Sequence, residues 1–466
     1  MNPTRSLTRH PEGSIRELWS ISMPLMISIL ASLFMIFTDR IFLAHYSLAS
    51  LNAAATSGTL AWALMAGVGM LTAMSEIFVA QYNGAGQYQK LGTPVWQMVW
   101  VSLFSLVFFI PIGIWGAPLF FQDNLYAELE IEMFRWLMFF GPSYALLTTF
   151  SGFFIGRGKT KILVWLAISA NMINIALDWA LIFGVPGILP EMGIRGAAIA
   201  TSLGYIFEAS VLAYLFLRKK NREDFGTGRY QIDWAEMKKC CKVGFPQGLF
   251  CSLEVIGWAI FYSLMTRLGE VHITVSSICQ SIIILLSFFY DGLSRGASAV
   301  AGNLIGAGKR ELVSKVLKSG AILLIIFNLI VGSFLILDPG DTLRFLFSID
   351  NAFDETLKVC LIFSFLYLFF EGIRWLLSGL LVAAGDTVFL FVAGSLSVWI
   401  LLLAPIYLIV VQKGLSVEYA WGLAALYSAL LFGLYQIRFQ WGRWKTIDLI
   451  QSDSSKESLD PLPEDY

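Results

Sequence analysis

Twelve hydrophobic stretches, each about 20 residues long, constrain this chain more than any other feature. Their centres lie near residues 28, 66, 105, 144, 172, 206, 252, 285, 326, 369, 398 and 428. A helix of about 20 apolar residues crosses roughly 30 Å of hydrocarbon, whereas the strands of a membrane barrel alternate over about ten residues. The sequence therefore predicts an all-α integral membrane protein with twelve transmembrane helices.

Composition and motifs narrow the class of protein. Only 14% of the 466 residues are charged and the formal net charge is −1, so nothing indicates a nucleic-acid partner. The five cysteines and three histidines fit neither a zinc site nor a disulfide framework. The glycine-rich strings NGAG and IGAGK do not complete a phosphate-binding loop, and we expect them to form tight turns on the cytoplasmic side. We therefore expect no enzyme and no cofactor.

The positive charges predict the orientation. Most of the 32 lysine and arginine residues fall at the N-terminus, in the even-numbered loops and at the C-terminus. Because these residues accumulate on the cytoplasmic side of a membrane protein, both termini are predicted to be cytoplasmic. If one helix were missed or wrongly added, every later loop would change sides and the positive charges would no longer fall mainly on one side.

Paired strings indicate an internal repeat. NGAGQYQKL and IGAGKRELV place Gly84 and Gly306 222 residues apart, and Pro24 and Pro246 keep the same spacing. SGFFIGRGKT and SGLLVAAGDT recur further on at a spacing of 227. The twelve helices therefore divide into two six-helix pseudo-symmetric lobes.

The predicted organisation follows from the repeat. We expect an N-terminal lobe at residues 1–217, a cytoplasmic linker at 218–239, a C-terminal lobe at 240–445 and a disordered acidic tail at 446–466. Six helices return the chain to its starting side, so the lobes run parallel about an axis along the membrane normal. Two such lobes can rock about a central site, which is the geometry of alternating-access transport.

Ionisable residues inside the helices are costly and usually face a bundle interior or an aqueous cavity. They are Asp39, Glu76, Arg135, Asp178, Glu208, Glu254, Asp291, Arg295, Glu371 and Arg374. Glu254 and Glu371 fall near the midplane of the seventh and tenth helices, where they could share a Na⁺ or a proton. Tyr367, one turn before Glu371, could add a phenolic oxygen. No other metal site is expected.

Charge pairing is the competing interpretation of these acids. Arg374 lies three residues after Glu371 and can reach the same helix face. Asp291 and Arg295, four residues apart, form a similar charge pair nearer the cytoplasm, for which we favour a structural role.

A second polar cluster is expected in the first lobe. Asp39 and Asp178 both fall toward the outer third of their helices, with Asn174 one turn before Asp178. These side chains could belong to a cation-coupling site, or they could only tie helices together.

Several long strings, taken in order, resemble one known family. They are MPLMISILASLFMIFTDRIFLA, NMINIALDWALIFG, MGIRGAAIATSLGYI, GFPQGLFCSLEVIGWAIFYSLMTRLG and SGLLVAAGDT. Together they resemble the multidrug and toxic compound extrusion (MATE) transporters, particularly the NorM-like branch. The resemblance implies a monomer in the bacterial cytoplasmic membrane that exports small organic cations in exchange for Na⁺ or H⁺.

The resemblance also implies roles for particular residues. The family's seventh-helix and tenth-helix acids match Glu254 and Glu371, and its aromatic hydroxyl matches Tyr367. The first-helix and fifth-helix acids match Asp39 and Asp178. Arg374 departs from the family pattern.

Two other functions stay open at this stage. A flippase for lipid-linked precursors of the same superfamily would be expected to have a more basic cavity and extra helices. The third possibility is a channel or a receptor without transport activity. The two-lobed repeat argues against it.

Overall fold

The computed structural model describes residues 7–337 and 354–450. Within these residues, twelve helical segments are long and apolar enough to cross a membrane. Each segment contains one of the twelve centres predicted from the sequence, so the predicted number of spans is confirmed. The continuous apolar runs explain the helices, because a backbone in lipid must satisfy its hydrogen bonds within its own segment.

The N-terminal bundle holds the first six spans. Its helices are α1 (Ile15–Tyr46), α2 (Leu48–Thr72), α3 (Ser75–Gly84), η1 (Tyr88–Lys90), α4 (Gly92–Phe104), α5 (Leu106–Pro111), η2 (Ile112–Gly116), α6 (Ala117–Phe121), α7 (Ala127–Gly156), α8 (Lys161–Ile182) and α9 (Gly193–Phe216). Within this bundle, α7 packs against α2, α3, α4 and α9, and α8 packs against α1 and α9.

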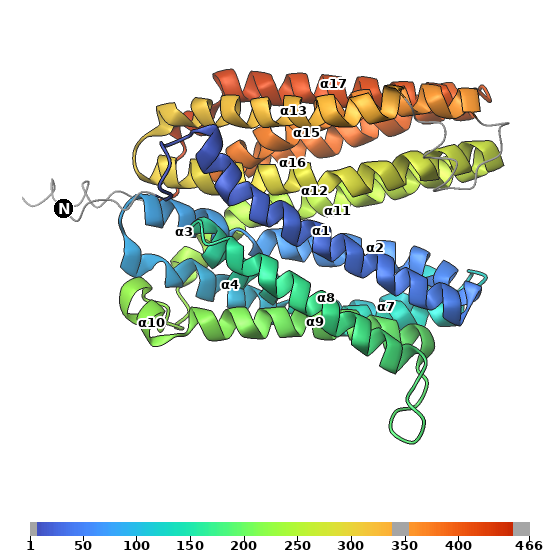
Figure 1. Ribbon diagram of the computed structural model, residues 1–466, viewed down its shortest axis with the longest axis horizontal. Coiled ribbons are helices and arrows are strands. Elements are labelled where there is room, and N and C mark those ends of the chain that lie inside the picture. The colour runs from blue at the N-terminus through green and yellow to red at the C-terminus, as the bar shows by residue number, and fades with distance from the viewer. Residues whose placement is uncertain (1–6, 338–353, 451–466) are drawn as a thin grey trace, which may run out of the picture.

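The C-terminal bundle repeats the arrangement. Its helices are α11 (Trp234–Leu268), α12 (Glu270–Gly306), η3 (Arg310–Leu312), α13 (Val313–Leu337), α15 (Asp354–Ala383), α16 (Thr387–Ser397), η5 (Val398–Leu403), η6 (Ile406–Val411), α17 (Val417–Trp441) and η7 (Arg443–Thr446). Figure 1 shows the two bundles side by side, with α1 crossing between them. This arrangement agrees with the predicted two-lobed all-α fold.

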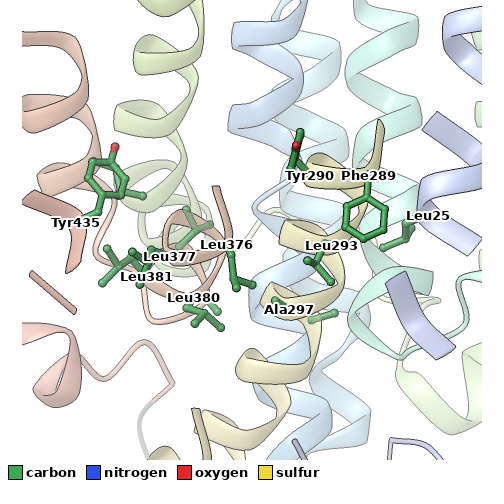
Figure 2. Packing of buried hydrophobic residues seen from close by; sticks show 14 of the residues in the cluster. Leu25, Phe289, Tyr290, Leu293, Ala297, Leu376, Leu377, Leu380, Leu381 and Tyr435 are labelled. Carbon is green, nitrogen blue, oxygen red and sulfur yellow. The ribbon is translucent and has the colours of Figure 1, made fainter. Parts of the chain in front are cut away.

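Helix α15 is central in the C-terminal bundle, where it packs against α12, α13 and α17. Leucines at 376, 377, 380 and 381 are fully buried, and Figure 2 shows Leu376 and Leu380 on the side of Leu293 and Ala297 of α12 and the other two toward Tyr435. This apolar layer lies directly after the polar segment of α15, so the charged residues there are held on a tightly packed helix.

The connection between the bundles docks on the first one. It contains the short helix α10 (Lys219–Phe225), and α11 begins at Trp234, inside the expected linker. The indole nitrogens of Trp96 and Trp100 in α4 donate to the carbonyl oxygens of Thr227 (2.8 Å) and Tyr230 (2.9 Å). The start of α11 is thereby fixed to the N-terminal bundle. Of the expected tail, residues 451–466 lie outside the described part of the chain.

The bundles meet along a glycine-lined seam near the end of the molecule that carries the chain start. A Cβ on Gly84 would overlap the backbone of Asn303, and a Cβ on Gly306 would overlap the backbone of Gln81. Asn83 also donates to the amide oxygen of Asn303 at 2.7 Å. Only residues without a side chain allow the two backbones to approach this closely.

The seam follows the internal repeat. Adding 222 to Gly84 gives Gly306, and adding it to Gln81 gives Asn303, so the two glycine contacts are copies of one another. Likewise, Gly296 packs on Ser22 and Gly244 packs beside Met74. Here too, adding 222 to Ser22 gives Gly244, and adding it to Met74 gives Gly296. The repeat therefore governs how the bundles touch as well as how each bundle folds.

Candidate functional site

Arg374 of α15 joins the two predicted glutamates. Its Nη2 donates to Oε1 of Glu371 at 2.6 Å and to Oε1 of Glu254 at 3.0 Å, while its Nε donates to Oε2 of Glu371 at 2.6 Å. Glu371 and Arg374 are 5% and 2% exposed. Helix geometry explains the pair, since residues three apart share a face, and a guanidinium matches a carboxylate through two parallel hydrogen bonds.

The two glutamates are not equivalent. Both oxygens of Glu371 accept hydrogen bonds from Arg374. Oε2 of Glu254, on α11, receives no hydrogen bond from any described residue, and the side chain of Glu254 is 21% exposed. The site therefore holds two carboxylates, one guanidinium and one carboxylate oxygen that is free to take another partner.

Tyrosines and a tryptophan surround these charges. Tyr367 is 5% exposed and packs edge to face on Trp258 of α11, with ring centroids 5.4 Å apart. The ring centroid of Tyr435 in α17 lies 5.6 Å from the guanidinium carbon of Arg374. The buried hydroxyl of Tyr427, also in α17, has no hydrogen-bond partner among the described residues. The surroundings of the charges are thus aromatic and contain a spare hydroxyl.

The structure also brings together the polar residues of the first lobe. Thr201 of α9 donates to Oδ2 of Asp39 in α1 at 2.8 Å. In the amide orientation that satisfies its neighbours, the nitrogen of Asn174 donates to Oδ1 of Asp39 (3.0 Å) and Oδ2 of Asp178 (3.2 Å). Oδ1 of Asp178 is buried without a partner in the described structure. This cluster therefore has two acids and no base in direct contact.

The expected direct pair between Asp291 and Arg295 does not form. No ion pair joins them among the described residues, although both lie on α12. Arg295 is instead close enough to interact electrostatically with Asp291, with Glu76 of α3 and with Tyr144 of α7. Arg295 therefore lies among polar groups from three helices and is not held by Asp291 alone.

Sequence reasoning missed Thr201, Trp258, Tyr427 and Tyr435. Hydroxyl and indole groups are common in membrane helices and cause no break in hydropathy, so nothing marks these four against the other tyrosines, threonines and tryptophans. The charged residues, by contrast, are conspicuous in apolar segments. No group of three or more metal-ligating side chains is found among the described residues.

The family model MatE matches residues 24–180 and 248–408, one segment in each bundle. This chain belongs to the MatE family. The match covers helices that supply both acid clusters, with Asp39, Asn174 and Asp178 in the first segment and Glu254 and Glu371 in the second. The MatE match confirms the family to which the sequence strings pointed.

Known proteins resemble this MatE chain over most of its length. It is 26% identical over 452 residues to "Probable multidrug resistance protein NorM" of Thermotoga maritima, covering 95% of this chain and 96% of the relative. It is 26% identical over 302 residues to "Multidrug resistance protein MdtK" of Klebsiella pneumoniae, covering 63% and 65%. Both relatives are named as multidrug resistance proteins.

Two solved structures share the fold. An outward-facing multidrug resistance MATE family transporter of the MOP superfamily superposes with a TM-score of 0.78 at 20% identity, covering 95% of this chain and 98% of that one. A MOP superfamily transporter from Pyrococcus furiosus gives 0.79 at 20% identity, covering 96% and 100%. At this identity the likeness establishes the MatE architecture alone.

Proposed function

We propose that this MatE protein is a secondary active antiporter that exports organic cations from the bacterial cytoplasm by alternating access, driven by inward flow of a coupling cation. The multidrug resistance proteins among its relatives support the export of drugs. The observation that carries the coupling proposal is the Glu254–Arg374–Glu371 triad, whose buried charges sum to one negative charge. One monovalent cation neutralises it.

Glu254 is the exchangeable member of this triad. Arg374 occupies both oxygens of Glu371, whereas Glu254 keeps one oxygen and part of its surface accessible. A hard cation such as Na⁺ requires several oxygen ligands, and Glu254 offers a single oxygen here. A proton needs only one, so the present geometry favours H⁺ over Na⁺ at this position.

Competition for Glu254 accounts for coupling. An organic cation that approaches the triad gains most from an ionised carboxylate, and a proton on Glu254 removes that charge. Binding of the two is therefore negatively coupled, and linkage makes the effect reciprocal. The aromatic groups around the triad, Trp258 and Tyr367 among them, supply faces on which an organic cation can stack.

The two bundles touch along the seam at the end that carries the chain start, so the transporter is closed at that end. With both termini on the cytoplasmic side, as the positive charges predict, this is a state closed to the cytoplasm. The glycine contacts of residues 84, 244, 296 and 306 are then the contacts that must separate when the transporter opens inward.

The test is transport by the purified protein in liposomes under separately imposed pH and Na⁺ gradients, with a fluorescent organic cation as the substrate. We expect a pH gradient to drive uptake in the wild type, and we expect Glu254→Gln to abolish it while the protein remains folded. Glu270→Gln, at an exposed glutamate of α12, is the matched control and keeps full activity. Unimpaired transport by Glu254→Gln would contradict the mechanism, and transport driven by Na⁺ alone would contradict the choice of ion.

A further inference from the structure

A basic cavity lies away from both acid clusters, at the end of the N-terminal bundle that carries the chain start. Its volume is about 580 Å³. The walls come from the first turns of α1, the turn between α7 and α8, and the end of α9. The proposed transport cycle does not use this cavity.

Four of the lining residues are cations, and none of the lining residues is acidic. The cations are Arg157, Lys159, Lys161 and Arg218. Lys159, Lys161 and Arg218 are exposed, and they form no ion pair with any described residue. Lys159, Lys161 and Arg218 therefore place positive charge at the cavity with no described acid paired to them.

Arg157 is fixed in place by aromatic rings. Its guanidinium carbon lies 3.6 Å from the ring centroid of Phe225 and 4.7 Å from that of Phe153. Stacking of this kind restricts the side chain before any ligand arrives, which lowers the conformational entropy lost on binding. One wall of the cavity is thus preorganised.

The start of α8 adds to the positive potential. This helix has 22 residues, and Thr160, Lys161 and Ile162 at its beginning line the cavity. The side chain of Thr160 does not cap the helix. The first N–H groups of an uncapped helix carry partial positive charge and bind phosphate well. They reinforce the cations that line the same cavity.

The cavity also has an apolar side. Leu7, Ile21, Phe154, Ile162 and Leu215 line it. Trp165 on α8 and Tyr214 on α9, one turn from the lining residues, are 72% and 65% exposed, as is typical of aromatic residues at a membrane surface. A ligand that fits both sides has a negatively charged phosphate and an apolar chain.

We propose that this cavity binds the headgroup of an anionic phospholipid from the leaflet that faces the chain termini. The phosphate lies against Lys159, Lys161 and Arg218 at the start of α8, and the acyl chains run along the apolar side toward the outside of α8 and α9. Basic pockets between transmembrane helices recognise such headgroups in this way. The proposal does not depend on the transport mechanism.

The experiment measures lipid retention by the intact protein. The wild type, delipidated in detergent, is titrated with phosphatidylglycerol or phosphatidylcholine, and bound lipid is counted by native mass spectrometry. The test variant carries Lys159→Ala, Lys161→Ala and Arg218→Ala. The matched control carries Lys220→Ala, Lys238→Ala and Lys242→Ala, which remove the same charge from exposed positions outside the cavity.

We expect the test variant to lose affinity for phosphatidylglycerol by at least about tenfold, since each basic residue near an anionic surface contributes roughly fivefold. The control variant should change by less than about twofold. Equal losses in both variants, or equal retention of phosphatidylcholine, would overturn the site. Displacement of the lipid by millimolar inorganic phosphate would overturn the lipid assignment, because a soluble phosphate would then be the ligand. Both variants alter exposed side chains, and elution volume and thermal midpoint verify their folding.

Discussion

At the scale of single residues, Arg374 decides how the acids of the C-terminal bundle behave. It is 2% exposed and contacts both Glu371 and Glu254. A buried ion pair is weak evidence for stability, because desolvation offsets much of the attraction, but removal of one partner leaves an uncompensated charge. The triad therefore holds the charged side chains in position and contributes little net stability.

Replacing Arg374 should show this difference. Arg374→Ala leaves two carboxylates without a base and should lower the free energy of unfolding by about 3–5 kcal/mol. Arg374→Lys keeps the charge but loses the two parallel hydrogen bonds, so its effect should be smaller. The paired change Arg374→Met with Glu371→Met removes both charges and should recover part of the loss. Thermal midpoints of the three variants check this order, and equal midpoints for Arg374→Ala and the paired variant would refute it.

Sequence alone predicted the charged residues of both sites but did not decide which of them contact one another. Glu254, Glu371 and Arg374 stand out because lipid-spanning helices rarely contain charges. Whether Arg374 reaches Glu371 or Glu254 depends on how α11 packs against α15, which no local pattern encodes. Tyr427 and Thr201 were missed for the same reason, since their importance comes from neighbours on other helices.

At the scale of elements, the contact of α3 with α12 shows why glycine recurs in the paired strings. Sequence reasoning interpreted these strings as tight turns near the cytoplasm. The structure adds that Gly84 and Gly306 each lie against the backbone of the opposite bundle. A turn alone would not require a residue without a side chain at these two positions, whereas close backbone approach does.

Adding a methyl group at this contact should disfavour the closed state. Gly306→Ala places a Cβ against the backbone of Gln81, and overpacking of this kind costs about 1–3 kcal/mol. Because the contact exists only when the seam is closed, the population should shift toward a state with separated bundle ends. Spin labels at Lys220→Cys and Arg443→Cys, in a protein without its native cysteines, report the separation.

Gly433→Ala is the control for this change, since a Cβ there meets nothing within 4 Å. Its label distances should match those of the parent protein. A Gly306→Ala distribution that also matches the parent would contradict the role given to the seam.

At the scale of the whole molecule, transport requires the seam to open and close. Among the described residues, several hydrogen bonds that join the bundles lie near the end with the chain start, such as those from Asn83 to Asn303 and from Gln81 to the carbonyl oxygen of Ala383 (2.8 Å). One more, from Ser252 to the carbonyl oxygen of Ala63 (2.8 Å), lies near the middle of the helices. The repeat predicted two lobes from sequence, but it could not say at which end they meet, because both ends carry equally apolar helices.

Locking the seam should stop transport. The side chains of Asn83 and Asn303 are 2.7 Å apart, so Asn83→Cys with Asn303→Cys in a cysteine-free background should form a disulfide under oxidation. We expect oxidised protein to transport no substrate and reduction to restore activity. Each single cysteine variant should stay active under both conditions. Full activity of the crosslinked protein would exclude opening at this end as a step of transport.

The reciprocal seam has a consequence for the origin of the chain. When residue 84 contacts residue 303 and residue 306 contacts residue 81, each partner offers the same patch to the other, which is the definition of an isologous dimer interface. The contact is therefore one that two separate six-helix subunits could already have made with each other. In a single chain, by contrast, each half can change alone: 222 residues before Glu254 stands Ser32, and 227 before Glu371 stands Tyr144.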